Sequence, residues 1–377
     1  MTKAEDMFYM ERALSLAEKG AGRVNPNPLV GAVVVRDGSI IGEGWHERFG
    51  GLHAERNALA ACHEGAEGGT LYVTLEPCCH HGKTPPCTEA ILAHKISRVV
   101  IGSPDPNPLV SGEGVRILRE AGIAVTEGVL RDRCDALNRI FFHYIQNGTP
   151  YVTMKYAMTM DGRTATRAGH SKWITSSPAR IRVHEDRNRH MAIMTGTGTV
   201  LADDPMLNCR VPGGRSPVRL ICDTRLQTPL TARVVETAGE IPTWFLTCVS
   251  DVSLQAPYLE KGCRILEIPE RKGHVDLQAA MEILGREGID SIYLEGGSAL
   301  NGSALESDIV QALHCYIAPR LFGGVASRGP IGGQGVEFPS QAKALQITSV
   351  RFYGDDILIE SIRSRDGEDV NGCLQGL

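Results

Sequence analysis

One histidine and two cysteines near the start of the chain constrain its fold more than any other feature. They are His53, at the head of a His-Ala-Glu motif, and Cys78 and Cys87, each preceded by proline. One imidazole and two thiolates can hold a zinc ion by three ligands, with the fourth position left open for water. A structural zinc site normally has a fourth protein ligand. Glu55, two residues after His53, is close enough to exchange protons with such a water.

The order of these residues is typical of zinc deaminases that act on nucleobases, but the cysteine spacing differs from the usual two residues. Here eight residues, 79–86, separate the two thiols. Glycine and proline predict a loop, and Pro86 is suited to begin a helix near Cys87. A helix N-terminus and a metal both favour a thiolate there. One alternative is that these residues are ordinary buried cysteines and a core histidine with no metal. Another is that the loop supplies different metal ligands, since it also contains Cys79, His80 and His81.

Three polar residues are candidates for the mouth of this site. Lys83 lies in the loop between the cysteines and could contact an anionic substrate. Asn27 and His46 lie in or beside loops, where a turn asparagine and a surface histidine are the structural alternatives.

The chain is long enough for two domains. Its 377 residues exceed one typical core, so two domains of about 150 to 220 residues are expected. A hydrophobic content of 42% with 22% charged residues is that of a globular protein, and a net charge of −5 argues against nucleic acid as a partner. The 11 scattered cysteines favour reduced thiols. No secretory signal or membrane-spanning run is found, so a cytoplasmic location without a membrane partner is expected.

Asn147-Gly-Thr-Pro150 is the clearest linker, and it divides the chain into domains 1–148 and 149–365 with a tail, 366–377, expected to be disordered. The first half reads as a helix, a hairpin, and then alternating helices and strands, which predicts a three-layer α/β/α sandwich. The second half repeats strand–helix alternation and predicts an independent α/β domain. Its sheet is expected to be mostly parallel, with an antiparallel pair made by 312–317 and 358–362.

Two glycine-rich stretches follow predicted strands of the second half. One is Thr195-Gly-Thr-Gly-Thr199 and the other is Glu295-Gly-Gly-Ser298, which opens a helix. Glycines between a strand and a helix let backbone amides approach a phosphate. Neither stretch is a full dinucleotide fingerprint, and a plain tight turn is the alternative for each.

The whole chain, from about residue 5 to residue 363, closely resembles the bifunctional deaminase–reductase family of riboflavin biosynthesis. The first half is similar to the pyrimidine deaminase, through Asn25-Pro-Asn-Pro28, His53-Ala-Glu55 and the segment 75–87. The second half is similar to the reductase of dihydrofolate-reductase-like fold. It carries the motifs 158–164, 171–176, 199–205 and 295–297.

The resemblance implies two consecutive reactions on phosphorylated pyrimidines: zinc-dependent loss of a ring amine, with Glu55 moving the protons, and then NADPH-dependent reduction of the ribosyl group to ribityl. By this resemblance NADPH contacts Ala157, Trp173, Thr199, Asp203, Thr224, Gly297, Ser298, Ala299, Leu300, Asn301, Gly302 and Ser303. The substrate of the reduction contacts Ser171, Arg187, Leu207, Arg210 and Glu295. Arg187 and Arg210 suit phosphate, because the guanidinium fork matches phosphate oxygens.

Two other functions are possible for a chain with these motifs. A nucleic-acid-editing deaminase requires a basic, aromatic-lined channel, which the acidic balance of both halves disfavours. Alternatively, the second domain senses a ligand without catalysis. A homo-oligomer is also expected.

Overall fold

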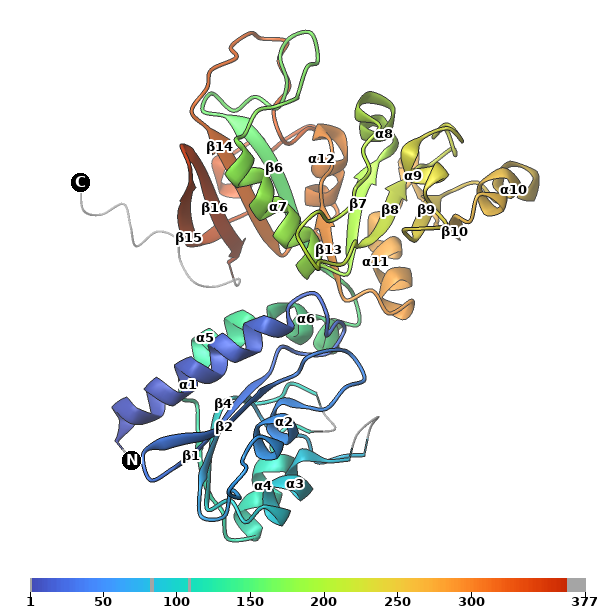
Figure 1. Ribbon diagram of the computed structural model, residues 1–377. Helices are drawn as coiled ribbons and strands as arrows, with labels where there is room; N and C mark the ends of the chain where they lie inside the picture. Colours follow the sequence, from blue (N-terminus) through green and yellow to red (C-terminus); the bar gives the residue numbers. More distant parts are fainter. Residues whose placement is uncertain (1, 82–84, 108–109, 365–377) are drawn as a thin grey trace. The chain divides into compact units, whose positions relative to one another are not determined.

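The computed structural model describes residues 2–81, 85–107 and 110–364. The chain divides into two compact units, Met1–Gly148 and Thr149–Leu377 (Figure 1). Lys83 and the tail 366–377 lie outside the described residues. Within the described ranges, no helix has the length and apolar character needed to cross a membrane.

The first unit is built on a five-stranded sheet in the order β2-β1-β3-β4-β5. Its strands are β1 (Gly31–Arg36), β2 (Ser39–Trp45), β3 (Thr70–Leu75), β4 (Arg98–Ser103) and β5 (Ala124–Glu127). The strand β1 pairs antiparallel with both β2 and β3, whereas β3, β4 and β5 run parallel. All six residues of β3 are buried, as expected for a central strand covered on both faces.

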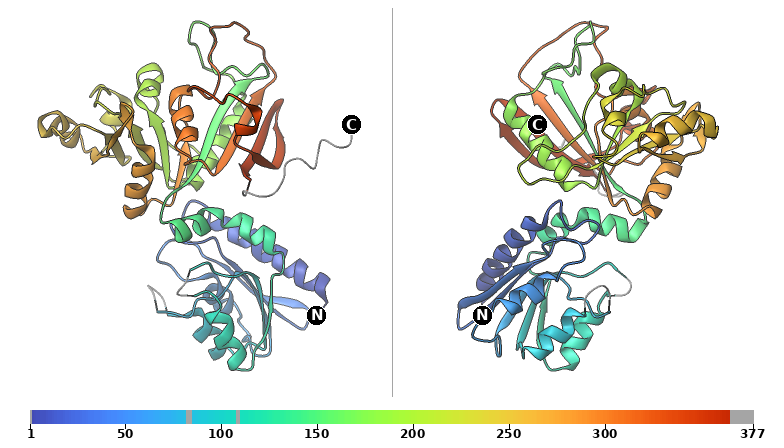
Figure 2. Two further views of the ribbon diagram at one scale, coloured as in Figure 1. Left: turned by 180° about the vertical axis from the view of Figure 1, so that it is seen from behind. Right: turned by 45° about the vertical axis from the view of Figure 1, so that its right-hand side comes forward.

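Helices cover both faces of this sheet. They are α1 (Lys3–Ala17), α2 (Ala54–Ala60), α3 (Cys87–Ala93), α4 (Glu113–Glu120), α5 (Arg131–Leu137) and α6 (Arg139–Asn147). One apolar core joins α2, α3 and α4 to one face of the sheet, and a second core joins α1 and α5 to the other. Figure 2 shows the two layers of helices from further directions. The predicted three-layer α/β/α sandwich is confirmed.

The helix α2 lies unusually close to the strand β2. A Cβ atom at Gly44 would lie 2.3 Å from the backbone nitrogen of Ala58, so only glycine permits this approach. This contact fixes the start of α2, where His53 is the N-cap residue, against the sheet.

The second unit contains a nine-stranded sheet in the order β10-β9-β8-β7-β13-β6-β14-β16-β15. Its strands are β6 (Tyr151–Thr159), β7 (Ala192–Gly196), β8 (Val218–Cys222), β9 (Thr243–Thr247), β10 (Arg264–Glu267), β13 (Ser291–Leu294), β14 (Ala312–Ala318), β15 (Leu345–Tyr353) and β16 (Asp356–Arg363). A separate two-stranded sheet pairs β11 (Glu270–Arg271) with β12 (His274–Val275). The nine-stranded sheet is parallel from β10 to β14 and antiparallel beyond, so the predicted antiparallel closing pair is confirmed.

Helices lie on both faces of the larger sheet as well. They are α7 (Ser177–Arg189), α8 (Thr197–Asp203), α9 (Arg233–Glu236), α10 (Val252–Glu260), α11 (Leu277–Arg286) and α12 (Ser298–Glu306). Apolar residues of α11 and α12 form one core with the sheet. Residues of α7 to α10 pack on the alternate side chains of the same strands. This arrangement confirms the predicted second α/β domain.

Candidate functional site

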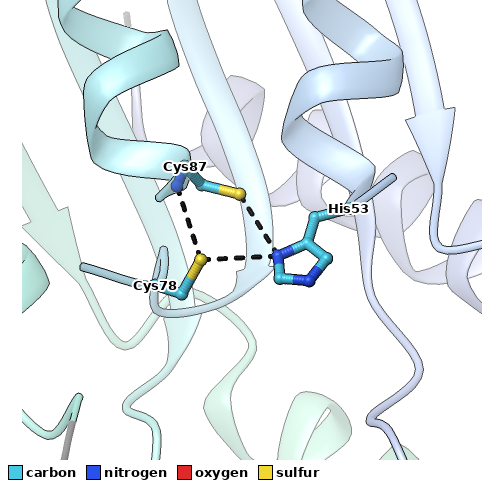
Figure 3. Close-up of side chains that lie close together, drawn as sticks. All are labelled: His53, Cys78 and Cys87. Atoms are coloured by element: carbon cyan, nitrogen blue, oxygen red, sulfur yellow. Dashed lines mark hydrogen bonds between the residues drawn. The ribbon is translucent and has the colours of Figure 1, made fainter. Parts of the chain in front are cut away.

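The fold brings the three predicted metal ligands of the first unit together (Figure 3). His53 caps the start of α2, Cys87 is the first residue of α3, and Cys78 follows β3. The Sγ atoms of Cys78 and Cys87 each lie 3.4 Å from Nδ1 of His53. Among the described residues, these three form the group of His, Cys, Asp or Glu side chains that could hold a metal, and Cys79, His80 and His81 are outside it.

The chemistry of these donors fits zinc. Two sulfur atoms and one imidazole nitrogen are the ligands that tetrahedral zinc prefers, and their atoms lie within 4.8 Å of one another. Hydrogen bonds from Cys87 and from the His53 ring lower the pKa of Cys78 to about 4, which favours the thiolate that a metal requires.

Glu55 lies in the first turn of α2, beside the three ligands, and is 4% exposed. Burial is the main cause that raises the pKa of this carboxyl to about 7, and the charge of the neighbouring Cys78 is the second. A carboxyl in such an environment can both accept and donate a proton near neutral pH.

The predicted residues Asn27 and His46 lie next to the metal group. Nε2 of His46 is 3.1 Å from Nδ2 of Asn27, and the rings of His46 and His53 are 5.5 Å apart in an edge-to-face arrangement. Nδ1 of His46 is 3.0 Å from the Leu52 carbonyl oxygen. Burial lowers the pKa of His46, so its neutral ring donates to Leu52 and accepts from the Asn27 amide.

In the second unit, the two glycine-rich stretches meet at the carboxyl ends of neighbouring parallel strands, β7 and β13. They open α8 and α12, and a Cβ atom at Gly297 would lie only 3.5 Å from Oγ1 of Thr199. Thr224 follows β8, the next parallel strand, and Ala157 lies in β6 beyond the part paired with β13, opposite Tyr316 of β14. These predicted cofactor contacts therefore share one edge of the sheet.

The predicted NADPH contacts at the start of α12, residues 297–303, include both solvent-exposed and buried positions. Gly297 and Ala299 are exposed, and Ser298, Leu300 and Ser303 are half-buried. Asn301 is 1% exposed and donates to the Pro330 carbonyl oxygen. A Cβ atom at Gly302 would lie 2.5 Å from the Gly332 carbonyl oxygen, so this glycine permits close packing of the segment that covers the helix.

The loop before α7 carries two further predicted contacts, Ser171 and Trp173, and its Lys172 reaches α8. Nζ of Lys172 lies 3.5 Å from a carboxylate oxygen of Asp203, the last residue of α8. The neighbouring Trp173 is 60% exposed, and the Arg180 guanidinium lies 4.6 Å from the centre of its ring. Ser171 lies half-buried in the same loop.

Arg187 and Glu295 were predicted as separate substrate contacts, but the structure joins them in a bidentate ion pair. Nε and Nη2 of Arg187 lie 2.6 and 3.0 Å from the two carboxylate oxygens. Nζ of Lys155 lies 3.6 Å from the same carboxylate. Burial alone would raise the pKa of Glu295, but the charges of Arg187 and Lys155 outweigh it and lower the pKa to about 2.

The other predicted substrate contacts lie on the loop after α8. Leu207 is buried, and the exposed Arg210 donates from Nε and Nη2 to Nε2 of His184, at 3.0 and 2.7 Å. Sequence reasoning did not select His184 or Lys155. Lys155 could have been selected from the sequence, because it is a charged residue inside an otherwise apolar strand. Nothing in the local sequence distinguishes His184.

Comparison with known proteins agrees with this division of the chain. Residues 3–103 match the family model of the cytidine and deoxycytidylate deaminase zinc-binding region, and residues 150–359 match that of the RibD C-terminal domain. The riboflavin biosynthesis protein RibD of Actinobacillus pleuropneumoniae is 52% identical over 357 residues, which cover 95% of each chain. RibD of Escherichia coli is 41% identical, covering 95% of this chain and 99% of its own.

Solved structures agree as well. Form 1 of RibD from Acinetobacter baumannii superposes with a TM-score of 0.87 at 36% identity, covering 97% of this chain and all of its own. A diaminohydroxyphosphoribosylaminopyrimidine deaminase/5-amino-6-(5-phosphoribosylamino)uracil reductase from Thermotoga maritima gives 0.84 at 38% identity, covering 96% and 99% of the two chains. With both halves matched in order and the relatives covered almost end to end, the chain belongs to the RibD family of riboflavin biosynthesis proteins.

Proposed function

We propose that the chain catalyses two consecutive steps of riboflavin biosynthesis. The first unit, 1–148, hydrolyses the ring amine of 2,5-diamino-6-(5-phosphoribosylamino)pyrimidin-4(3H)-one and releases ammonia. The second, 149–365, reduces the ribosyl group of the product, 5-amino-6-(5-phosphoribosylamino)uracil, to ribityl with NADPH. The observation that carries this proposal is the convergence of His53, Cys78 and Cys87 beside the buried Glu55.

His53, Cys78 and Cys87 would hold one zinc ion. When bound, zinc acts as a Lewis acid that makes water a nucleophile near neutral pH. Glu55, which is not one of the three ligands, would take a proton from the water and pass it to the ring nitrogen and then to the departing amine. Its burial keeps bulk water from competing for that proton.

The neighbours of the metal group would orient the pyrimidine ring. The amide of Asn27 is held by the neutral ring of His46, which in turn lies against His53. Asn27 can therefore present its Oδ1 acceptor and its second amide N–H to a base in a fixed direction, while both ring nitrogens of His46 are engaged in holding this arrangement. Lys83 would meet the substrate's phosphate, as its charge suggests.

NADPH, which supplies a hydride when bound, would lie along the shared edge of the larger sheet. Backbone amides at the starts of α8 and α12 suit its phosphates. The residues that would contact it are Ala157, Trp173, Thr199, Asp203, Thr224 and the segment 297–303. Within that segment, Asn301 and Gly302 would act by supporting the helix, since both are buried.

The substrate of the reduction would lie between the exposed Arg210 and the Arg187–Glu295 pair, with Ser171 and Leu207 beside it. Arg210 would bind the phosphate, because among the described residues its guanidinium has no carboxylate partner and donates to the imidazole of His184. Glu295 would hold a ribose hydroxyl while Arg187 and Lys155 keep it ionised.

The two activities can be separated by one substitution. We expect Glu55→Gln to abolish ammonia release, to retain zinc, and to leave NADPH-dependent reduction of the deaminated substrate intact. Glu89→Gln, which changes an exposed carboxylate of α3, is the matched control and should leave both activities unchanged. Metal analysis, ammonia release and NADPH oxidation are measured on each purified protein.

Joint loss of both activities in Glu55→Gln would contradict two independent sites. A wild-type protein that consumes substrate without oxidising NADPH would instead favour a second unit that only senses ligands. Assembly into a homo-oligomer remains a prediction.

A further inference from the structure

The loop between the two cysteines is longer than in the usual motif, yet its ends are drawn together. The backbone N–H groups of Cys87 and Thr88 donate to the Cys78 carbonyl oxygen, at 3.1 and 3.2 Å. The Cys87 N–H also lies 3.4 Å from Sγ of Cys78. These contacts fix the two thiols relative to each other, but they do not connect α3 to the helix that carries His53.

Arg56 makes that connection. It lies on α2, three residues after His53, and its guanidinium reaches across to the residues that precede Cys87. Nε donates to the Pro85 carbonyl oxygen at 3.2 Å and Nη2 donates to the Pro86 carbonyl oxygen at 2.8 Å. The two helices that begin with metal ligands are therefore linked directly by one side chain.

The need for such a link follows from the loop's length. Closing a loop of eight residues costs more chain entropy than closing one of two, so the position of its second end is less restricted by covalent geometry. Proline also removes the backbone donors that could otherwise tie residues 85 and 86 to a neighbour. A planar guanidinium with several donors in fixed directions can hold two adjacent carbonyl groups at once.

We propose that Arg56 is a positioning residue of the metal centre, which holds the start of α3 so that Cys87 faces His53. The inference rests on the proposed zinc site. It assigns to Arg56 a role in metal affinity and none in contacting the substrate, since two edges of its guanidinium are already occupied by Pro85 and Pro86.

The test compares zinc affinity in two variants of the full-length protein. Arg36 is the matched control: it is also half-buried in the first unit, and it also donates to a loop carbonyl oxygen, that of Gly65, at 3.1 Å. Competition with a chromophoric chelator should show that Arg56→Met weakens zinc binding by about 10- to 100-fold, the range for residues that support metal ligands. Arg36→Met should stay within about twofold of wild type, and Arg56→Lys should fall between them because a lysine cannot hold both carbonyl groups in a fixed plane.

Two further readouts distinguish the explanations. Thermal unfolding of each variant reports whether the first unit is folded, and the deaminase KM at saturating zinc should remain near the wild-type value. Zinc affinity of Arg56→Met equal to that of Arg36→Met would overturn the proposal, as would normal zinc affinity with a raised KM, which would make Arg56 a substrate contact. If the wild-type protein binds no zinc, the proposed function itself fails, whereas a failure confined to Arg56 leaves it standing.

Discussion

Arg187 and Glu295 form a buried, bidentate ion pair that joins the end of α7 to the carboxyl end of β13. Both side chains are 13% exposed. Removing one partner of such a pair leaves the other charge buried and uncompensated, which is more costly than removing both. Loss of either partner alone is therefore expected to destabilise the second unit as well as to alter its proposed substrate site.

Glu295→Gln should accordingly lower the free energy of unfolding of the second unit by about 3 kcal/mol. The double variant Arg187→Met/Glu295→Gln should recover part of this loss, because Arg187 is no longer left as a charge without its carboxylate and only Lys155 still loses that partner. Urea unfolding of the three proteins measures both values. A double variant no more stable than Glu295→Gln would contradict this account.

His190 should make the second unit less stable in mild acid. It is 3% exposed, and its neutral ring is fully bonded: Nδ1 donates to the Asp186 carbonyl oxygen at 2.8 Å and Nε2 accepts from the Thr153 hydroxyl at 3.0 Å. Burial lowers the pKa of His190 to about 4, below the ordinary 6.5. Between these values the unfolded chain binds a proton that the folded chain does not, so stability falls as pH drops from 6.5 to about 4.

Replacing His190 should make the free energy of unfolding fall less steeply as the pH drops from 6.5 to 4. His190→Asn is expected to be less stable than wild type at pH 7, with a slope of unfolding free energy that is shallower by up to about 1.4 kcal/mol per pH unit between pH 6.5 and 4. Urea unfolding across this range measures the slope. Glu295 acts in a lower window: its pKa is lowered, so its stabilisation is present above pH 4.5 and is lost as pH falls toward 2. An unchanged slope above pH 4.5 would refute the role of His190.

His184 should orient Arg210 without cancelling its charge. Burial and the charges of Arg187 and Arg210 lower the pKa of His184 to about 4, so the ring is neutral at pH 7. His184→Asp would supply a carboxylate instead, and we expect the KM of the phosphorylated substrate to rise about tenfold, since one charge-assisted hydrogen bond is worth at least that factor. His184→Asn, which keeps a neutral acceptor, should have a smaller effect. The KM for NADPH should not change in either variant, and an equal rise for both ligands would indicate general disruption.

Asp6 should be the most important acidic residue of α1 for the stability of the first unit. Its two carboxylate oxygens each lie 2.8 Å from a nitrogen of Arg98, on β4, and one also accepts from the Tyr72 hydroxyl at 2.9 Å. Asp6→Asn should lower the unfolding free energy by about 2 kcal/mol, because Arg98 would lose its partner in a largely buried place. Glu113→Gln, which removes an exposed pair with Arg116, should cost much less. Thermal unfolding of both variants checks the order, and equal losses would contradict it.

Much of the fold could be predicted from local sequence. Apolar runs between turn residues predict strands at 218–222, 243–247 and 291–294, which are the bounds of β8, β9 and β13. Proline near the start of 177–189 predicts a helix there, and this range coincides with α7. Among the elements that the prediction omitted are α5, α6, α10 and β15. The helix α5 has seven residues of which only Cys134 is buried, so it lacks an apolar period. In β15 the register shifts between Ile347 and Ser349, which breaks the alternation that marks a strand.

The sequence by itself determined the chemistry of the metal group, because His53, Glu55, Cys78 and Cys87 are recognised by residue type and order. It also indicated which strand ends carry glycine-rich turns. Only the tertiary structure decided which group each arginine contacts: Arg187 contacts Glu295, Arg210 contacts His184, and Arg56 contacts the two carbonyl groups before Cys87. The physical reason is distance along the chain. Local propensities act over a few residues, whereas these pairs join segments 26 to 108 residues apart, and packing of helices on the sheets is what brings them together.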